Sequence, residues 1–137
     1  MKSVVICCSQ RFKAEMQEWR EALEHQHDIS IVLIPDFRWH SKKCIRSPEH
    51  RRLKSRSYRR AIPGLVRGHL DKIRKVDVVF ILNINGYMGT NTTLELGAAH
   101  ILGKLICAYE HDKEEPCREI LIDKIVKTPS ALARLLR

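Results

Sequence analysis

Long apolar runs are absent from this chain, and so are the cysteine patterns that stabilise small secreted domains. No stretch approaches the roughly 20 apolar residues that a membrane-spanning helix needs. The opening apolar run, residues 4–8, is too short for the core of a secretory signal peptide. The 5 cysteines are odd in number and form no Cys-x-x-Cys pair, so neither a disulfide framework nor a zinc motif is predicted. We therefore expect a cytoplasmic protein with reduced thiols and no membrane partner.

The glycine fingerprints of common nucleotide sites are also missing. There is no Walker or Rossmann motif, which argues against ATP hydrolysis and nicotinamide chemistry. No set of His, Asp and Glu residues has metal-ligand spacing, so neither a metal nor any other cofactor is expected. No repeat or low-complexity linker divides the 137 residues, and this length can bury a core. The sequence thus predicts a single domain over residues 1–137.

Positive charge is confined to one segment of the chain. Residues 38–60 hold 10 lysines and arginines against one acidic residue, and the rest of the chain is neutral overall. Such a basic excursion attracts phosphate, either on a nucleotide or on a nucleic acid, although charge runs are often no more than solvated loops. All three interpretations remain open at this point.

Short apolar runs rich in β-branched residues alternate with stretches of helical spacing, which predicts an α/β fold with a parallel sheet. We expect strands at residues 3–8, 29–34, 77–83, 105–110 and 125–127, and helices at 13–26, 61–75, 94–102, 118–124 and after Thr128. Pro63 and Gly64 are placed in the first turn of their helix. The sequence predicts a flavodoxin-like, doubly wound five-stranded sheet of order 2-1-3-4-5. In this order the loops at 8–12 and 83–92 line one crevice.

The most informative motif is residues 83–99, NINGYMGTNTTLELGAA, which puts Glu95 on the first turn of a predicted helix after a glycine-containing loop. In one interpretation Thr92 and Glu95 form a capping box, in which the glutamate bonds back to the helix start. In the other, Glu95 faces the crevice as a nucleophile. Asn83 and Tyr87 would then offer neutral hydrogen-bonding groups to a sugar. The neighbouring Gly86 and Gly89 would permit a close approach of the backbone.

Two further candidates lie near the same crevice. Ser9 and Arg11 follow the first predicted strand and could bind a phosphate; alternatively, Ser9 caps a helix and Arg11 is solvated. His69 lies on the helix before the third predicted strand, where a lone histidine is commonly a surface or packing residue. It could instead serve as an acid or base near neutral pH.

Taken together, residues 5–12 (VICCSQRF), His69-x-x-Lys72-Ile73, residues 77–80 (DVVF) and residues 83–99 resemble the nucleoside 2-deoxyribosyltransferase-like superfamily. The resemblance spans most of residues 4–110 and implies the same flavodoxin-like sheet. It places the family's catalytic glutamate at Glu95 and the serine that holds the 5′-phosphate in nucleotide hydrolases at Ser9. Cys8 stands where the family usually has glycine, and His69 where it often has aspartate.

The resemblance implies an N-glycosidase or deoxyribosyltransferase that acts on a nucleoside or nucleoside 5′-monophosphate. Glu95 would attack C1′ and His69 would assist, while the predicted binding residues are Ser9, Arg11, Asn83, Gly86, Tyr87, Gly89 and Thr92. A homo-oligomer is expected, because related sites are often completed by a neighbouring subunit. The alternative is a non-catalytic nucleotide- or nucleic-acid-binding module that uses segment 38–60.

Overall fold

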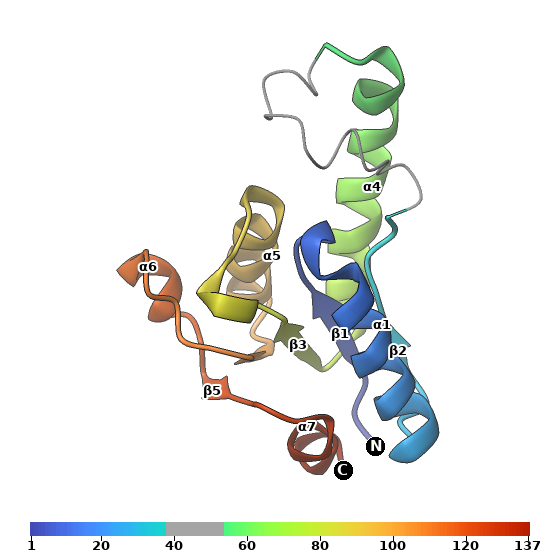
Figure 1. Ribbon diagram of the computed structural model, residues 1–137, viewed down its shortest axis with the longest axis vertical. Coiled ribbons are helices and arrows are strands. Elements are labelled where there is room, and N and C mark those ends of the chain that lie inside the picture. Colours follow the sequence, from blue (N-terminus) through green and yellow to red (C-terminus); the bar gives the residue numbers. More distant parts are fainter. Residues whose placement is uncertain (38–53) are drawn as a thin grey trace.

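The computed structural model describes residues 1–37 and 54–137, which form a layered α/β fold around one parallel sheet (Figure 1). Its five strands run in the order β2-β1-β3-β4-β5, which confirms the predicted flavodoxin-like architecture. The strands are β1 (Val4–Cys7), β2 (Val32–Leu33), β3 (Val78–Ile81), β4 (Leu105–Ala108) and β5 (Lys124–Ile125). All four neighbouring pairs are parallel. The outer strands β2 and β5 are shorter than the sequence predicts.

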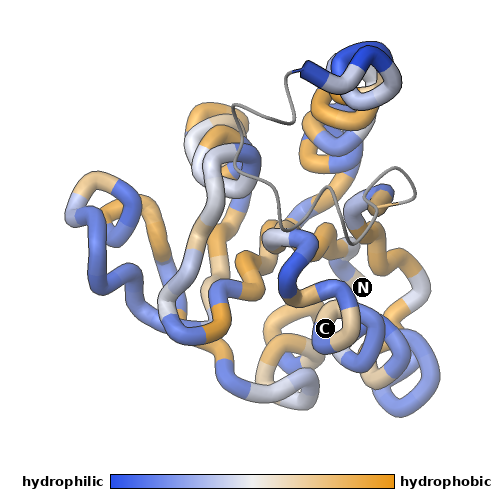
Figure 2. Tube along the Cα trace, turned by 45° about the horizontal axis from the view of Figure 1, so that its top comes forward, coloured by the Kyte–Doolittle hydropathy of each residue, from blue (hydrophilic) through white to orange (hydrophobic). Residues whose placement is uncertain are grey.

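The central strands are apolar throughout because both faces of the sheet are covered. On β1, Val4 and Ile6 face one apolar cluster while Val5 and Cys7 face the other. All four side chains are fully buried. Figure 2 shows hydrophobic stretches running through the middle of the molecule and hydrophilic stretches on its outer turns.

Two helices cover each face of the sheet. Helix α1 (Lys13–Glu21), continued by the π-helical turn η2 (Ala22–Gln26), packs with α7 (Pro129–Leu136) on one face. Helices α4 (Arg56–Lys75) and α5 (Thr90–Ile101) pack on the other face, where Ile73 and Leu96 enter the core. Two short 3-10 turns, η1 (Gln10–Phe12) and η3 (Ile84–Gly86), follow β1 and β3, and the short helix α6 (Pro116–Glu119) follows β4. Among the helices of the described residues, none has the length and apolarity to cross a membrane.

The start of α4 differs from the prediction. The helix begins at Arg56, where the Ser55 side chain accepts a hydrogen bond from the backbone N–H of Tyr58 at 3.3 Å. Pro63 and Gly64 therefore lie inside the helix and not in its first turn. Pro63 is exposed, so the carbonyl group that it leaves without an intrahelical donor can face water. Of the basic segment 38–60, residues 38–53 lie outside the described residues, and residues 56–60 form the start of α4.

The predicted helix at 118–124 is also wrong in its bounds. Helix α6 begins at Pro116, because a proline at the first helical position needs no backbone donor. It ends at Glu119, and Lys124 already pairs with Cys107 of β4. The fifth strand therefore begins one residue before the predicted range.

Candidate active site

A cavity of about 300 Å³ opens beside the carboxyl ends of β1 and β3. These neighbouring strands mark the switch point of the sheet, where open α/β folds bind ligands. Most of the predicted site residues line this cavity, namely Ser9, Arg11, His69, Tyr87, Gly89, Thr92 and Glu95. The structure thus brings together both predicted catalytic residues and five of the seven predicted binding residues.

Glu95 reaches the cavity from the second turn of α5, since this helix begins at Thr90 and not near Leu94. The capping-box interpretation is wrong, because the N-cap is Gly89 and no side chain caps the helix. Instead the Thr93 hydroxyl donates a hydrogen bond to the carbonyl oxygen of Gly89 at 2.8 Å. Glu95 Oε2 is buried and has no hydrogen-bond partner within residues 1–37 and 54–137. The carboxyl group is therefore not used to hold the helix start.

His69 projects from α4 towards Glu95 and is itself buried. Its Nε2 atom lies 3.6 Å from Glu95 Oε2 and 3.2 Å from the Sγ atom of Cys7. Cys7 is the last residue of β1, so three different elements supply this cluster. His69 is therefore not a surface residue; it is buried, as a packing residue would be, and it also lines the candidate site.

Burial moves the two pKa values in opposite directions. It raises the pKa of Glu95 from 4.5 to about 8, and the nearby Cys7 thiol offsets only part of this rise. Burial lowers the pKa of His69 to about 4, and the positive charge of Lys72 adds to the effect. In each case the low-polarity surroundings penalise the charged form. At neutral pH both groups are uncharged, so their 3.6 Å approach is not an ion pair.

A cation stacked on an aromatic ring lines part of the cavity. The Arg11 guanidinium lies 3.8 Å from the centre of the Tyr87 ring, and Phe12 meets the same ring edge-on at 6.1 Å. Ser9 accepts a hydrogen bond from the backbone N–H of Arg11 at 3.3 Å. Ser9 thus caps η1, as its alternative interpretation states, while also lining the cavity.

Asn83 and Gly86 do not line the cavity, although both were predicted to bind substrate. The Asn83 amide donates to the carbonyl oxygen of Glu110 at 2.8 Å and accepts from the N–H of Glu110 at 2.9 Å, which ties the ends of β3 and β4 together. Gly86 has a φ of +73°, and a Cβ atom there would lie 3.2 Å from the carbonyl oxygen of His111. Both residues shape the loop that carries Tyr87.

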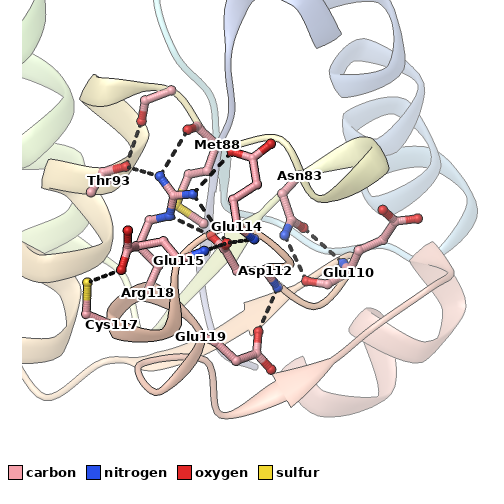
Figure 3. A network of polar contacts seen from close by, with 11 residues as sticks. Asn83, Met88, Thr93, Glu110, Asp112, Glu114, Glu115, Cys117, Arg118 and Glu119 are labelled. Atoms are coloured by element: carbon pink, nitrogen blue, oxygen red, sulfur yellow. Dashed lines mark hydrogen bonds and ion pairs between the residues drawn. The ribbon is translucent and has the colours of Figure 1, made fainter.

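A polar network behind this loop was not predicted (Figure 3). Arg118 donates to the Asp112 carboxylate at 2.6 and 3.2 Å, and its guanidinium also reaches the carbonyl oxygen of Met88 at 3.4 Å and the Thr93 hydroxyl at 3.5 Å. Asp112 also accepts hydrogen bonds from the backbone of the 112–115 turn. Arg118 therefore links α6 to the loop and helix that carry Tyr87 and Glu95. No local motif signals this link, because its partners lie 25 and 30 residues away.

The chain was compared with protein-family models and with curated proteins. No protein-family model matches the chain, and no curated protein matches it either.

Proposed function

We propose that this protein is an N-glycosidase or deoxyribosyltransferase of the nucleoside 2-deoxyribosyltransferase-like type, acting on a nucleoside or nucleoside 5′-monophosphate. The observation that carries the proposal is the Glu95 carboxyl group. It lines a cavity at the switch point of the sheet, lies beside a buried histidine and is not used to cap its own helix. The cavity volume of about 300 Å³ is at the lower end of the range for small-molecule sites, about 300–1,000 Å³.

The proposed chemistry is a double displacement at the anomeric carbon. A carboxylate oxygen of Glu95 bonds to C1′ while the N-glycosidic bond breaks, and the electron pair of that bond leaves with the base, which takes up a proton. Water then adds its oxygen to C1′, loses a proton and displaces Glu95 as a carboxylate. If a second base adds in place of water, the outcome is transfer and not hydrolysis.

His69 fits an orienting role better than an acid role in the ligand-free site. With a pKa of about 4 it is neutral at pH 7, so it carries no proton to spare for the leaving base. Its Nε2 atom lies 3.6 Å from Glu95 Oε2, beyond hydrogen-bond distance, so in this role it would confine the carboxyl group by close contact. In this mechanism the leaving nucleobase takes its proton from solvent.

Arg11 and Tyr87 support the choice of a nucleoside or nucleotide as ligand. Tyr87 presents an aromatic ring of the kind on which a base can stack, and that ring is covered by Arg11 at 3.8 Å in the free protein. A substrate phosphate would draw the exposed guanidinium away from the ring, since charge-assisted bonds to phosphate are stronger than contacts to an aromatic face. Phosphate binding and base stacking would thus be coupled.

The proposal is tested by incubating the protein with a panel of nucleosides and 5′-monophosphates, with and without a second free base. Chromatography would detect released or exchanged base. We expect release by the wild type and by Glu18→Gln, which changes an exposed glutamate on α1, and none by Glu95→Gln. Equal release by Glu95→Gln, or no release by the wild type from any member of the panel, would overturn the proposal.

A nucleic-acid-binding module remains the second candidate, on one observation. The first two turns of α4 expose Arg56, Arg59 and Arg60, and the first turn contains no acidic residue. Binding of random oligonucleotides whose affinity falls steeply with salt, and which is unchanged in Glu95→Gln, would favour this function.

A further inference from the structure

We infer that the side chains of Cys7, His69 and Glu95 form a binding site for one divalent cation of Zn²⁺ type. One donor atom from each residue lies within 4.8 Å of the other two. When the metal displaces their protons, Cys7 and Glu95 offer a thiolate and a carboxylate beside the imidazole of His69, and Zn²⁺ accepts all three ligand types. The inference concerns binding and does not depend on the proposed glycosidase activity.

Two of the three distances between donor atoms are close to those around a tetrahedral ion, and the third is within 4.8 Å. Zinc bonds of about 2.0–2.3 Å place neighbouring ligand atoms about 3.3–3.6 Å apart in a tetrahedron. The observed separations are 3.2 Å between Cys7 Sγ and His69 Nε2, and 3.6 Å between His69 Nε2 and Glu95 Oε2. The two side chains that flank the imidazole therefore already stand at ligand spacing.

An orphaned polar atom provides the independent sign of a missing ligand. Glu95 Oε2 is buried and has no hydrogen-bond partner among the described residues. A buried polar atom without a partner costs free energy, and an unseen ion or water is one of its ordinary explanations. This is the same oxygen that faces His69 Nε2, so a cation between them would satisfy it.

The scaffold favours a fixed site with one open position. Cys7 lies within β1 and is paired in register with Ile81 of β3, so its backbone cannot move freely. His69 and Glu95 are presented by the two helices that cover the same face of the sheet. Both residues also line the cavity, from which water can supply a fourth ligand. Three protein ligands and one exchangeable position are the arrangement of catalytic and exchangeable zinc sites.

The ligand set also selects the metal. A thiolate favours Zn²⁺ or Co²⁺ over Mg²⁺ and Ca²⁺, which prefer oxygen ligands alone. Co²⁺ is a useful probe because tetrahedral cobalt bound to a thiolate has an intense charge-transfer band that cobalt bound to nitrogen and oxygen lacks.

The experiment is a titration of the full-length, metal-stripped protein with Co²⁺, followed by displacement with Zn²⁺ against a chromophoric chelator. We expect one ion per chain, a thiolate charge-transfer band and its loss when Zn²⁺ is added. Cys7→Ser should remove the band and weaken Zn²⁺ binding by more than about tenfold. The matched control is Cys107→Ser, a fully buried strand cysteine that belongs to the cluster on the opposite face of the sheet and should leave both readouts unchanged.

X-ray absorption spectroscopy of the zinc-loaded wild type tests the site without any substitution, in case Cys7→Ser does not fold. We expect one sulfur neighbour at about 2.3 Å, with nitrogen and oxygen completing four ligands. His69→Gln should weaken Zn²⁺ binding in the same way as Cys7→Ser. Failure of the wild type to bind Zn²⁺, a metal shell without sulfur, or a thiolate band that survives Cys7→Ser would overturn the inference.

Discussion

The imidazole of His69 and the carboxyl group of Glu95 meet at 3.6 Å as two uncharged groups, because the packing that buries them also desolvates them. Their pKa values are about 4 and about 8, so neither carries a charge between these two values. A nucleophilic Glu95 must therefore lose its proton before it can attack.

The first prediction is that base release rises with pH along a limb centred near pH 8. The limb follows the ionisation of Glu95 in the free protein, whose pKa is about 8 because burial disfavours the carboxylate. It is measured as kcat/KM from pH 5 to 9 with a metal chelator present. A profile that is flat from pH 6 to 9, or that falls over this range, would contradict the assignment.

The second prediction is that Glu95→Gln stabilises the protein at pH 8 by a few kcal/mol. The folded protein holds the Glu95 proton up to about pH 8, whereas the unfolded chain releases it near 4.5. The wild type therefore loses stability as pH rises between these values and levels off above them. Glutamine carries no titrating proton, so the free energy of unfolding of Glu95→Gln exceeds that of the wild type by an amount that grows over the same pH range. Urea unfolding at pH 5 and pH 8 measures this difference in the free energy of unfolding. The control Glu18→Gln should differ from the wild type by the same amount at both pH values.

The third prediction is that Arg118→Leu destabilises the protein by about 3 kcal/mol, because it leaves a buried carboxylate without its charge partner. The Asp112 side chain is fully buried and that of Arg118 is 15% exposed. Arg74→Leu is the control, since it breaks an exposed pair with Asp71 and should cost less than about 1 kcal/mol. Urea unfolding at pH 7 would measure both losses, and equal losses would show that the network contributes little.

The same ion pair sets an acid limit on stability. Burial alone raises the pKa of Asp112, but hydrogen bonds from Arg118 and from the 112–115 turn outweigh it and hold the pKa below 3.8. The stabilisation is therefore complete above the unfolded value of 3.8 and is lost as the pH falls through the lower folded value.

The fourth prediction concerns Gly86, for which we expect alanine to cost about 1–2 kcal/mol. The backbone there has a φ of +73°, and the added Cβ would press on the carbonyl oxygen of His111 at 3.2 Å. Gly68→Ala on the exposed side of α4 meets nothing within 4 Å and should stabilise by about 1 kcal/mol. Thermal unfolding of the two variants should thus shift in opposite directions.

The fifth prediction is that Arg11→Gln raises KM for nucleoside 5′-monophosphates by at least about tenfold while changing KM for nucleosides little. A charge-assisted hydrogen bond to phosphate contributes about 1.5–3 kcal/mol, and a nucleoside has no phosphate to lose. Lys13→Gln, an exposed lysine two residues further on, is the control. An equal change in KM for both substrate classes would assign Arg11 to ring stacking alone.

The sequence by itself determined the layered α/β fold and the elements that carry the site. Apolar β-branched runs such as residues 77–82 are local patterns, and parallel pairing follows from the helices between them. The strand order puts the loops after β1 and β3 beside one crevice. The sequence could therefore place four site residues near that crevice, namely Ser9, His69, Tyr87 and Glu95. The bounds of α4 could not be predicted. Pro63 is a local helix-breaking signal, but it is tolerated inside the helix because it is exposed, and the Ser55 cap sets the start about one and a half turns earlier than the predicted residue 61.

Only the tertiary structure decided what each of these side chains touches. The Asn83 amide forms two hydrogen bonds with the backbone of Glu110, and the sequence gives no sign of this partner 27 residues away. Cys7 reads as one more apolar strand residue, yet the fold sets its sulfur 3.2 Å from His69, 62 residues further along the chain. The pKa values of His69 and Glu95 likewise depend on desolvation by packed neighbours. Such burial arises where separate elements meet, so no local pattern encodes it.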